Sequence, residues 1–341
     1  MGKANRNDVS GVLLLDKQTG QSSNWALQRV KRLFNAKKTG HTGTLDPLAS
    51  GLLPLVFGHA TKFASDLIDS DKEYEAIVRL GFQSTTGDAE GVLTEIPGTE
   101  LLDLSDEFLA KVAQGFVGEI DQVPPMYSAL KHAGKPLYEY ARQGVEIGRE
   151  ARKIVIKELD VKAGVSADFT REAKDGVNCG GDDAEGRSTP SFPGQYLWLR
   201  VVCSKGTYVR TLGEDFARKL GTQGYLTALR RTGIGSLRIE DALRFDQLED
   251  KIKQGILPSQ FLAPVDCLLD GLSALHLDAK QTQRCLHGQR LALGQAGLIA
   301  GRTRIYGVTA SNETVFLGTG LLETDGKTAL LRPKKLIQDT Q

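Results

Sequence analysis

The sequence predicts an α+β fold followed by a small β-barrel-like module, and three observations support this prediction. Segments with alternating or continuous apolar and branched residues, such as 74–80 and 196–203, are typical of strands. Other segments have apolar residues at helical spacing. From about Leu272 onward, short apolar stretches separated by glycines follow one another, which is typical of closely spaced strands and turns.

The first predicted elements are a strand, a turn and a helix. The apolar run 11–16 predicts a buried strand, and residues 18–21 predict a turn. A helix should follow, because either Ser22 or Ser23 can cap it. The apolar positions that define the helix are Leu27, Val30 and Phe34.

The later elements alternate between strands and helices. We expect Tyr74 to begin a strand on its apolar side. An amphipathic helix is predicted from Phe108 to Phe116, ending near Gly118. The strand 196–203 leads to a further helix that ends at Gly221. The apolar positions of that helix are Leu212, Phe216 and Leu220.

Length and composition indicate two domains. The chain has 341 residues, of which 40% are hydrophobic and 25% charged, enough for a large core. We place a larger domain at 1–271 and a terminal module at 272–341. Within the first, about 165–195 is rich in glycine and small polar residues, which predicts a flexible insertion. The formal net charge is only +1, so any nucleic-acid surface must come from local clustering.

The sequence predicts neither a structural metal nor a membrane segment. The four cysteines form no CxxC pair and no metal-ligand spacing with the histidines, which favours a reduced intracellular protein. The N-terminus lacks the apolar core of a signal peptide, and no apolar run approaches the length of a membrane span. We therefore expect a cytoplasmic protein, and we expect a monomer without an obligate protein partner. The cysteines are Cys179, Cys203, Cys267 and Cys285.

The segment Gly40–Pro54, GHTGTLDPLASGLLP, contains a single acidic residue, Asp46. Its glycines permit unusual backbone conformations, and Pro47 restricts Asp46. We therefore expect Asp46 to lie on a rigid, bent loop. Taken alone, an Asp-Pro pair most often forms a turn.

This segment resembles the catalytic-aspartate motif of the TruB family of tRNA pseudouridine synthases. Other blocks similar to the same family occur in the same order, and together they cover most of residues 11–235. The resemblance implies a mixed, largely antiparallel central sheet flanked by helices, followed by an RNA-binding PUA domain. The blocks are Leu13–Lys17 with Ser22–Val30, Asp69–Gly81, Gln122–Arg152, and Cys203–Thr211 with Leu229–Thr232.

The resemblance implies isomerisation of uridine to pseudouridine in the T loop, position 55, of tRNA. Such a reaction breaks the bond from ribose C1' to uracil N1 and rejoins C1' to C5, and it requires no cofactor. A carboxylate can form a covalent intermediate, so Asp46 is the expected nucleophile. Whether it attacks base or sugar stays open. Arg210, in the block SKGTYVR, is expected to pair with Asp46.

Further site residues follow from the same resemblance. Tyr74 matches the family's active-site tyrosine, which could stack on the flipped uracil or relay the C5 proton; with an ordinary pKa of about 10, stacking is favoured. Leu229 is expected to pack against the base, and His41 to contact the everted nucleotide. Lys17 and Tyr127 are expected to support the pocket or the RNA.

A cluster of basic residues between Ser22 and Leu45 has no acidic neighbour in the sequence. By itself such a run is often only a solvated helix face. Beside the Asp46 segment we expect it to contact RNA phosphates. The cluster consists of Arg29, Lys31, Arg32, Lys37 and Lys38.

Two other readings remain open. A noncatalytic RNA-binding or RNA-folding protein would keep the motif for structural reasons. An aspartate-nucleophile hydrolase would need a second carboxylate near Asp46 to activate water, and the sequence suggests no obvious one.

Overall fold

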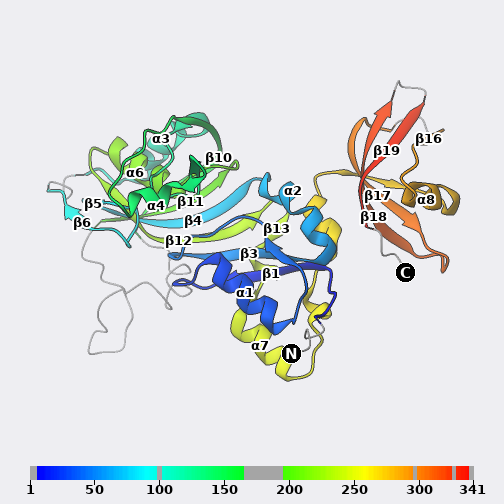
Figure 1. Ribbon diagram of the computed structural model, residues 1–341. Coiled ribbons are helices and arrows are strands. Elements are labelled where there is room, and N and C mark those ends of the chain that lie inside the picture. Colours follow the sequence, from blue (N-terminus) through cyan, green and yellow to red (C-terminus); the bar gives the residue numbers. More distant parts are fainter. Residues whose placement is uncertain (1–5, 98–101, 165–194, 295–297, 325–327, 338–341) are drawn as a thin grey trace.

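The computed structural model describes residues 6–97, 102–164, 195–294, 298–324 and 328–337 (Figure 1). The insertion predicted at about 165–195 therefore lies, except for Gln195, outside the described residues.

A ten-stranded mixed sheet forms the centre of the larger part of the molecule. Its path is β14-β1-β3-β12-β4-β11-β10-β7, with β2 beside β3 and β13 beside β12. The β1–β14 and β3–β12 pairs are parallel and the other pairs are antiparallel, which confirms the predicted fold class. The strands are β1 (Gly11–Lys17), β2 (Thr39–His41), β3 (Ala49–Phe57), β4 (Lys72–Leu80), β7 (Gly118–Gln122), β10 (Arg152–Ala163), β11 (Tyr196–Cys203), β12 (Gly224–Ile234), β13 (Leu237–Arg238) and β14 (Leu243–Arg244).

Four helices bury their apolar sides against one face of this sheet in a shared core. Figure 1 shows α1 and α7 near β1 and β3, and α3 and α6 toward the β10 and β11 end. Strands β12 and β4 lie between these groups in the strand order. The helices are α1 (Ser23–Leu33), α3 (Asp106–Gln114), α6 (Val209–Lys219) and α7 (Phe245–Lys253).

Shorter elements complete the larger part. A second apolar cluster, built partly by η1, α2 and η6, lies against β1 and β3. The short helices are η1 (Gly58–Lys62), α2 (Ala64–Ile68), α4 (Leu137–Ala141), η4 (Ile239–Asp241), η5 (Pro258–Phe261) and η6 (Val265–Leu269). Two small hairpins pair β5 (Phe82–Ser84) with β6 (Leu93–Glu95) and β8 (Lys131–His132) with β9 (Lys135–Pro136).

The C-terminal part is a five-stranded sheet with its own apolar cluster. The sequence predicted only strands and turns here, but the structure also contains helix α8 (Ala279–Leu286), which begins with a capping box between Asp278 and Gln281. The strands are β15 (Ser273–His276), β16 (Leu291–Leu293), β17 (Gly301–Val308), β18 (Thr314–Thr324) and β19 (Ala329–Leu336).

The two sheets are joined by a compact contact around η1 and α2. The rings of Phe63 and Phe316 meet edge to face, with centroids 5.6 Å apart. Lys62 donates from Nζ to the carbonyl of Leu336 at 2.8 Å, and Lys335 donates to the carbonyl of Lys62 at 3.0 Å. These reciprocal bonds hold the C-terminal part against the end of β3.

A buried carboxylate strengthens this contact. Asp66 on α2 has a side chain that is only 10% exposed, and it pairs with Arg302 at 2.5 Å. Lys335 lies 3.7 Å from its other oxygen. The carboxylate of α2 is therefore neutralised by cations from the C-terminal sheet.

The helix expected over Phe108–Phe116 is shorter in the structure and ends at Gln114, because Gly115 caps it before Phe116. The loop predicted to contain Asp46 consists of residues 42–48, between β2 and β3.

We predict that Gly51→Ala destabilises the fold strongly. Gly51 lies in β3 with φ of +100°, and a Cβ there would lie 2.3 Å from the backbone oxygen of Arg231. The loss in unfolding free energy should be about 2 kcal/mol or more, measured by chemical denaturation. Gly271 has no atom within 4 Å of an added Cβ, so Gly271→Ala is the matched control. Equal stability of the two variants would contradict the prediction.

Candidate active site

The loop that contains Asp46 is fixed to α1 and to the turn that precedes α1. The Ser23 hydroxyl accepts from the Leu45 backbone N–H at 2.7 Å and donates to the Leu45 carbonyl at 2.9 Å. Gly20 donates to the carbonyl of Pro47 at 2.8 Å. Of the two serines predicted to cap α1, Ser22 is the cap, and Ser23 instead holds this loop. Asp46 is thus presented on a short, braced connection, as the sequence predicted.

Arg210 pairs with Asp46, as predicted from the sequence. Its Nη2 lies 2.9 Å from Asp46 Oδ2. The arginine side chain is only 7% exposed, whereas that of Asp46 is 43% exposed. The pair therefore has a buried cation and a carboxylate that remains accessible.

Three other groups fix the Arg210 guanidinium. Nη1 donates to the carbonyl of Thr86 at 3.0 Å and to Asp88 Oδ2 at 3.2 Å. Nη2 also donates to the carbonyl of Tyr127 at 2.7 Å. A guanidinium with this many acceptors is held in one orientation.

Asp88 is a site residue that the sequence analysis missed. Its side chain is 4% exposed, and its Oδ1 accepts from the Thr86 hydroxyl at 2.6 Å and from the Glu90 backbone N–H at 3.1 Å. Both oxygens are therefore engaged. The segment Thr86-Gly87-Asp88 reads in sequence as a simple polar turn, and only the fold brings it against α6.

The pairing of β12 with β3 and β4 determines which side chains lie together near the Asp46 loop. Leu229 on β12 lies opposite Ala49 of β3 and Ala76 of β4. Two residues along β12, Arg231 lies opposite Tyr74. Residues directly opposite one another on neighbouring strands share a face, so Tyr74 and Leu229 lie on the same face of the sheet, as part of the helix-covered core.

The surroundings of Tyr74 do not favour a role as a base. Burial raises the pKa of its hydroxyl above the ordinary value, and the Arg231 guanidinium acts in the opposite direction without cancelling that shift. A phenol with a raised pKa ionises less readily at neutral pH. The ring is therefore better suited to stacking than to accepting a proton.

His41 lies at the end of β2, opposite Leu55 of β3. Burial, and next the charge of Arg231, lowers the pKa of its imidazole. Its Nδ1 is buried and has no hydrogen-bond partner in the described part of the chain. The lowered pKa favours the neutral form of the ring at pH 7.

Lys17 is buried, whereas Tyr127 is half-buried and lines a cavity. The Lys17 ammonium donates to the carbonyls of Gln18 at 2.9 Å and Gln21 at 2.7 Å, and burial lowers its pKa to about 8. It therefore shapes the turn that meets Pro47. Tyr127 contributes its backbone carbonyl, which accepts from Arg210.

The predicted basic cluster is only partly free of other engagements. Arg29 pairs with Glu249 at 3.2 Å and lies over the ring of Phe245, so it joins α1 to α7. Lys37 lies 3.5 Å from Asp8, and both side chains are well exposed. Arg32 donates to the carbonyl of Gln28 within its own helix. Lys31 is half-buried and Lys38 is exposed.

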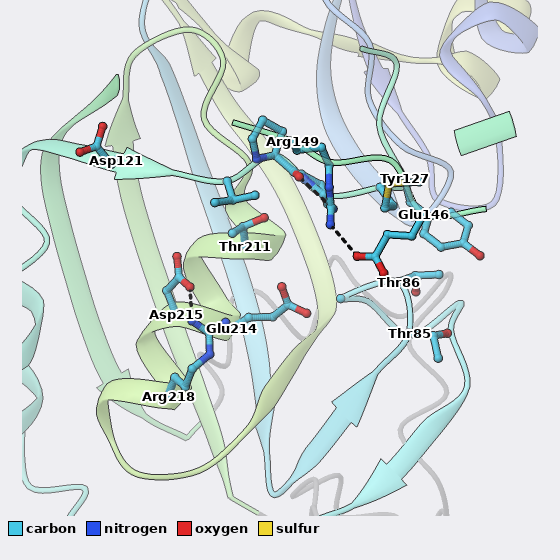
Figure 2. Close-up of a pocket in the computed structure, with 15 residues that line it drawn as sticks. Thr85, Thr86, Asp121, Tyr127, Glu146, Arg149, Thr211, Glu214, Asp215 and Arg218 are labelled. Atoms are coloured by element: carbon cyan, nitrogen blue, oxygen red, sulfur yellow. Dashed lines mark hydrogen bonds and ion pairs between the residues drawn. The ribbon is translucent and has the colours of Figure 1, made fainter. Parts of the chain in front are cut away.

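A polar cavity of about 470 Å³ adjoins the Thr86 and Tyr127 anchors of Arg210. Figure 2 shows Arg149 directed toward Glu146 at one side, and Thr211, Glu214, Asp215 and Arg218 on α6. Burial raises the pKa of Glu214 to about 7. This cavity thus contains a carboxyl group that titrates near neutrality.

Within the described ranges, no cluster of three or more His, Cys, Asp or Glu side chains could hold a metal ion. Among the helices that the structure describes, none is long and apolar enough to cross a membrane.

Three family models match the chain in sequence order. Residues 31–180 match the TruB family pseudouridylate synthase N-terminal domain. Residues 210–270 match the tRNA pseudouridylate synthase B C-terminal domain. Residues 273–337 match the pseudouridine synthase II TruB C-terminal domain.

Similar curated proteins extend over nearly the whole chain. A protein of Ralstonia pickettii named tRNA pseudouridine synthase B is 49% identical over 339 residues, covering 98% of this chain and 96% of its own. A protein of the same name from Dechloromonas aromatica is 43% identical over 330 residues, covering 97% and 96%.

Solved structures have a similar fold. A chain in the crystal structure of a Cbf5-Nop10-Gar1 complex superposes with a TM-score of 0.65 at 23% identity, covering 96% of this chain and 84% of that chain. A chain in the structure of an H/ACA RNP bound to a substrate RNA containing 2'-deoxyuridine gives 0.63 at 20% identity, covering 98% and 92%.

We predict that Glu214 makes stability depend on pH. Its pKa rises from 4.5 to about 7 on folding, so the folded protein binds the proton more tightly than the unfolded chain. The stability that this group contributes is fully present below about pH 4.5 and is lost as pH rises through 7.

Replacing Glu214 with Gln should remove this loss. The unfolding free energy of Glu214→Gln minus that of the parent should be larger at pH 8 than at pH 5. Urea unfolding at both pH values measures this difference. The exposed Glu313 supplies the control, Glu313→Gln. A parent-to-variant difference that stays constant with pH would refute the assignment.

Proposed function

The chain belongs to the TruB family of pseudouridine synthases, and from this premise we propose that it converts uridine to pseudouridine in tRNA, at position 55 of the T loop. The observation that supports this most directly is the 2.9 Å pair between Arg210 and the accessible carboxylate of Asp46. Tyr74 and Leu229 share one face of the sheet near the Asp46 loop, and in this proposal they border a planar base.

Asp46 acts as the nucleophile in this proposal. The buried Arg210 guanidinium stabilises the charged carboxylate, and attack by that carboxylate divides the exchange of C1'–N1 for C1'–C5 into two steps. Asp88 pairs with Nη1 of Arg210, and Nη2 stays directed at Asp46. The attack on base or on sugar is compatible with this arrangement.

The substrate uridine must leave its stack to reach Asp46, at a cost of a few kcal/mol. The ring of Tyr74 stacks on the everted uracil and Leu229 packs against it, so the detached base stays in register for rejoining. His41, with its neutral imidazole, contacts the everted nucleotide. Lys17 keeps the adjoining turn in shape, and Tyr127 supports the pocket through its carbonyl.

The tRNA T arm is the proposed partner. Phosphate contacts offset the cost of eversion, and Lys31, Lys37 and Lys38 are better placed for them than Arg29, which is stacked on α7. We assign residues 272–341 to a PUA-like RNA-binding domain, following residues 1–271 as the catalytic domain. The enzyme works as a cytoplasmic monomer without an obligate protein partner.

The two other readings are less well supported. A noncatalytic RNA binder would have no use for an accessible carboxylate braced by a buried arginine. A hydrolase needs a second carboxylate that is free to activate water. Both oxygens of Asp88 already accept hydrogen bonds, and at Glu90, which also lies near Asp46, burial and then the charges of Asp88 and Asp46 raise the pKa.

We predict that Asp46→Asn abolishes pseudouridine formation in a tRNA transcript, because an amide is not a nucleophile. RNA affinity should stay within about tenfold, or roughly 1.4 kcal/mol. Base-resolved mapping of pseudouridine measures the first and filter binding the second. Asp250→Asn, at an exposed residue of α7, is the control and should retain activity. Turnover by Asp46→Asn at the parent rate would refute the assignment.

We also predict that Lys38→Gln weakens tRNA binding and reduces its salt dependence. Each phosphate contact contributes about one unit to the slope of log affinity against log salt for duplexes, and somewhat less for single strands. Affinity measured from 50 to 300 mM KCl should therefore show a shallower slope than the parent. Lys111→Gln, at an exposed lysine of α3, should leave the slope unchanged. Identical slopes for all three proteins would exclude Lys38 from the RNA contact.

A further inference from the structure

A second buried guanidinium lies beneath the Asp46 loop and has no part in the mechanism above. Arg231 on β12 is 1% exposed. Its Nε donates to the carbonyl of Leu52 at 2.8 Å, and Nη2 donates to the carbonyl of Gly43 at 3.3 Å. Within the described residues it forms no ion pair with a carboxylate. Its charge is therefore solvated by peptide dipoles.

Such a group is costly to keep. Removing a cation from water costs several kcal/mol unless a counterion or several hydrogen bonds compensate. A well-packed apolar side chain of similar size would avoid that cost. We therefore expect the guanidinium to make contacts here that an apolar side chain could not make.

Strand register brings Arg231 to Tyr74. The two residues are direct partners across β12 and β4, so their side chains leave the sheet on the same face. The Arg231 guanidinium lies close enough to the Tyr74 hydroxyl to lower its pKa, against the larger effect of burial. On the other side of β12, Arg231 is paired with Gly51, which has no side chain to occupy the same space.

The two carbonyl acceptors fix the guanidinium from the opposite side. Leu52 belongs to β3, and Gly43 belongs to the loop that contains Asp46. Arg231 is thus held by the backbone that leads into and out of Asp46. The same residue is the direct cross-strand neighbour of Tyr74.

We propose that Arg231 is a positioning residue for the isomerisation, which acts by fixing the hydroxyl and hence the ring of Tyr74 relative to Asp46. The inference rests on the proposed function of Asp46 and Tyr74. In this arrangement the stacking surface for the uracil and the loop of the nucleophile share one anchor. Rotation of the detached base then takes place against a ring whose orientation is set.

A double-mutant cycle tests this proposal. Arg231→Lys keeps the charge but loses the planar fork of donors, and Tyr74→Phe removes only the hydroxyl. We expect Arg231→Lys to lower kcat about tenfold or more with KM within threefold. In the Tyr74→Phe background, the same substitution should lower kcat threefold or less. Single-turnover pseudouridine formation in a tRNA transcript measures all four proteins.

The neighbouring arginine provides a matched control. Arg230 precedes Arg231 on β12, points to the other face and pairs with Asp16 through both Nη atoms at 3.1 and 2.9 Å. Arg230→Lys should leave kcat within threefold of the parent. If Arg231→Lys does not fold, as judged by circular dichroism and thermal unfolding, Arg231→Gln replaces it and should show the same coupling to Tyr74.

Each remaining outcome has a distinct meaning. Equal losses of kcat with and without the Tyr74 hydroxyl would overturn the proposal, because Arg231 would then act on the fold or the loop alone. An effect confined to KM, or none at all, would overturn it as well. A parent protein that forms no pseudouridine would instead refute the proposed function.

Discussion

The site depends on one buried guanidinium, that of Arg210. It joins the Asp46 loop, the turn at Thr86 and Asp88, and the carbonyl of Tyr127, three segments that are far apart in the sequence. Each acceptor that is lost would leave a buried donor unpaired, at a cost of about 1–3 kcal/mol. The geometry of the Asp46 carboxylate is therefore inseparable from the folding of the surrounding chain.

The charges of the two buried arginines, Arg210 and Arg231, are compensated in different ways. Arg210 lies between two carboxylates, so its charge is compensated locally and directed at Asp46. Among the described residues, Arg231 has no carboxylate partner and donates to two carbonyl groups, and its charge acts on the neighbouring His41 and Tyr74. After burial, the charge of Arg231 is the next cause that lowers the pKa of His41. This favours the uncharged imidazole beside the proposed position of the uracil.

The sequence was informative where local pattern determines structure. The strands near 11–16 and 196–203 follow from continuous or alternating apolar residues, and Asp46 and Arg210 follow from family motifs. Asp88 and Arg231 could not be found in this way, because a turn aspartate and an arginine in an ALRRT segment look solvent-exposed until the sheet register is known. Arg29 shows the converse: it was expected to bind phosphate, but its stacking on Phe245 depends on a contact more than two hundred residues away.

Because of the contact between the two sheets, β3 connects the Asp46 loop to the C-terminal part over a fixed length. This strand begins three residues after Asp46 and ends where η1 meets the C-terminal part. Its nine residues span about 30 Å at roughly 3.3 Å per residue. For an RNA that contacts both the Asp46 loop and the C-terminal part, as proposed, this length would set the separation between the two contacts.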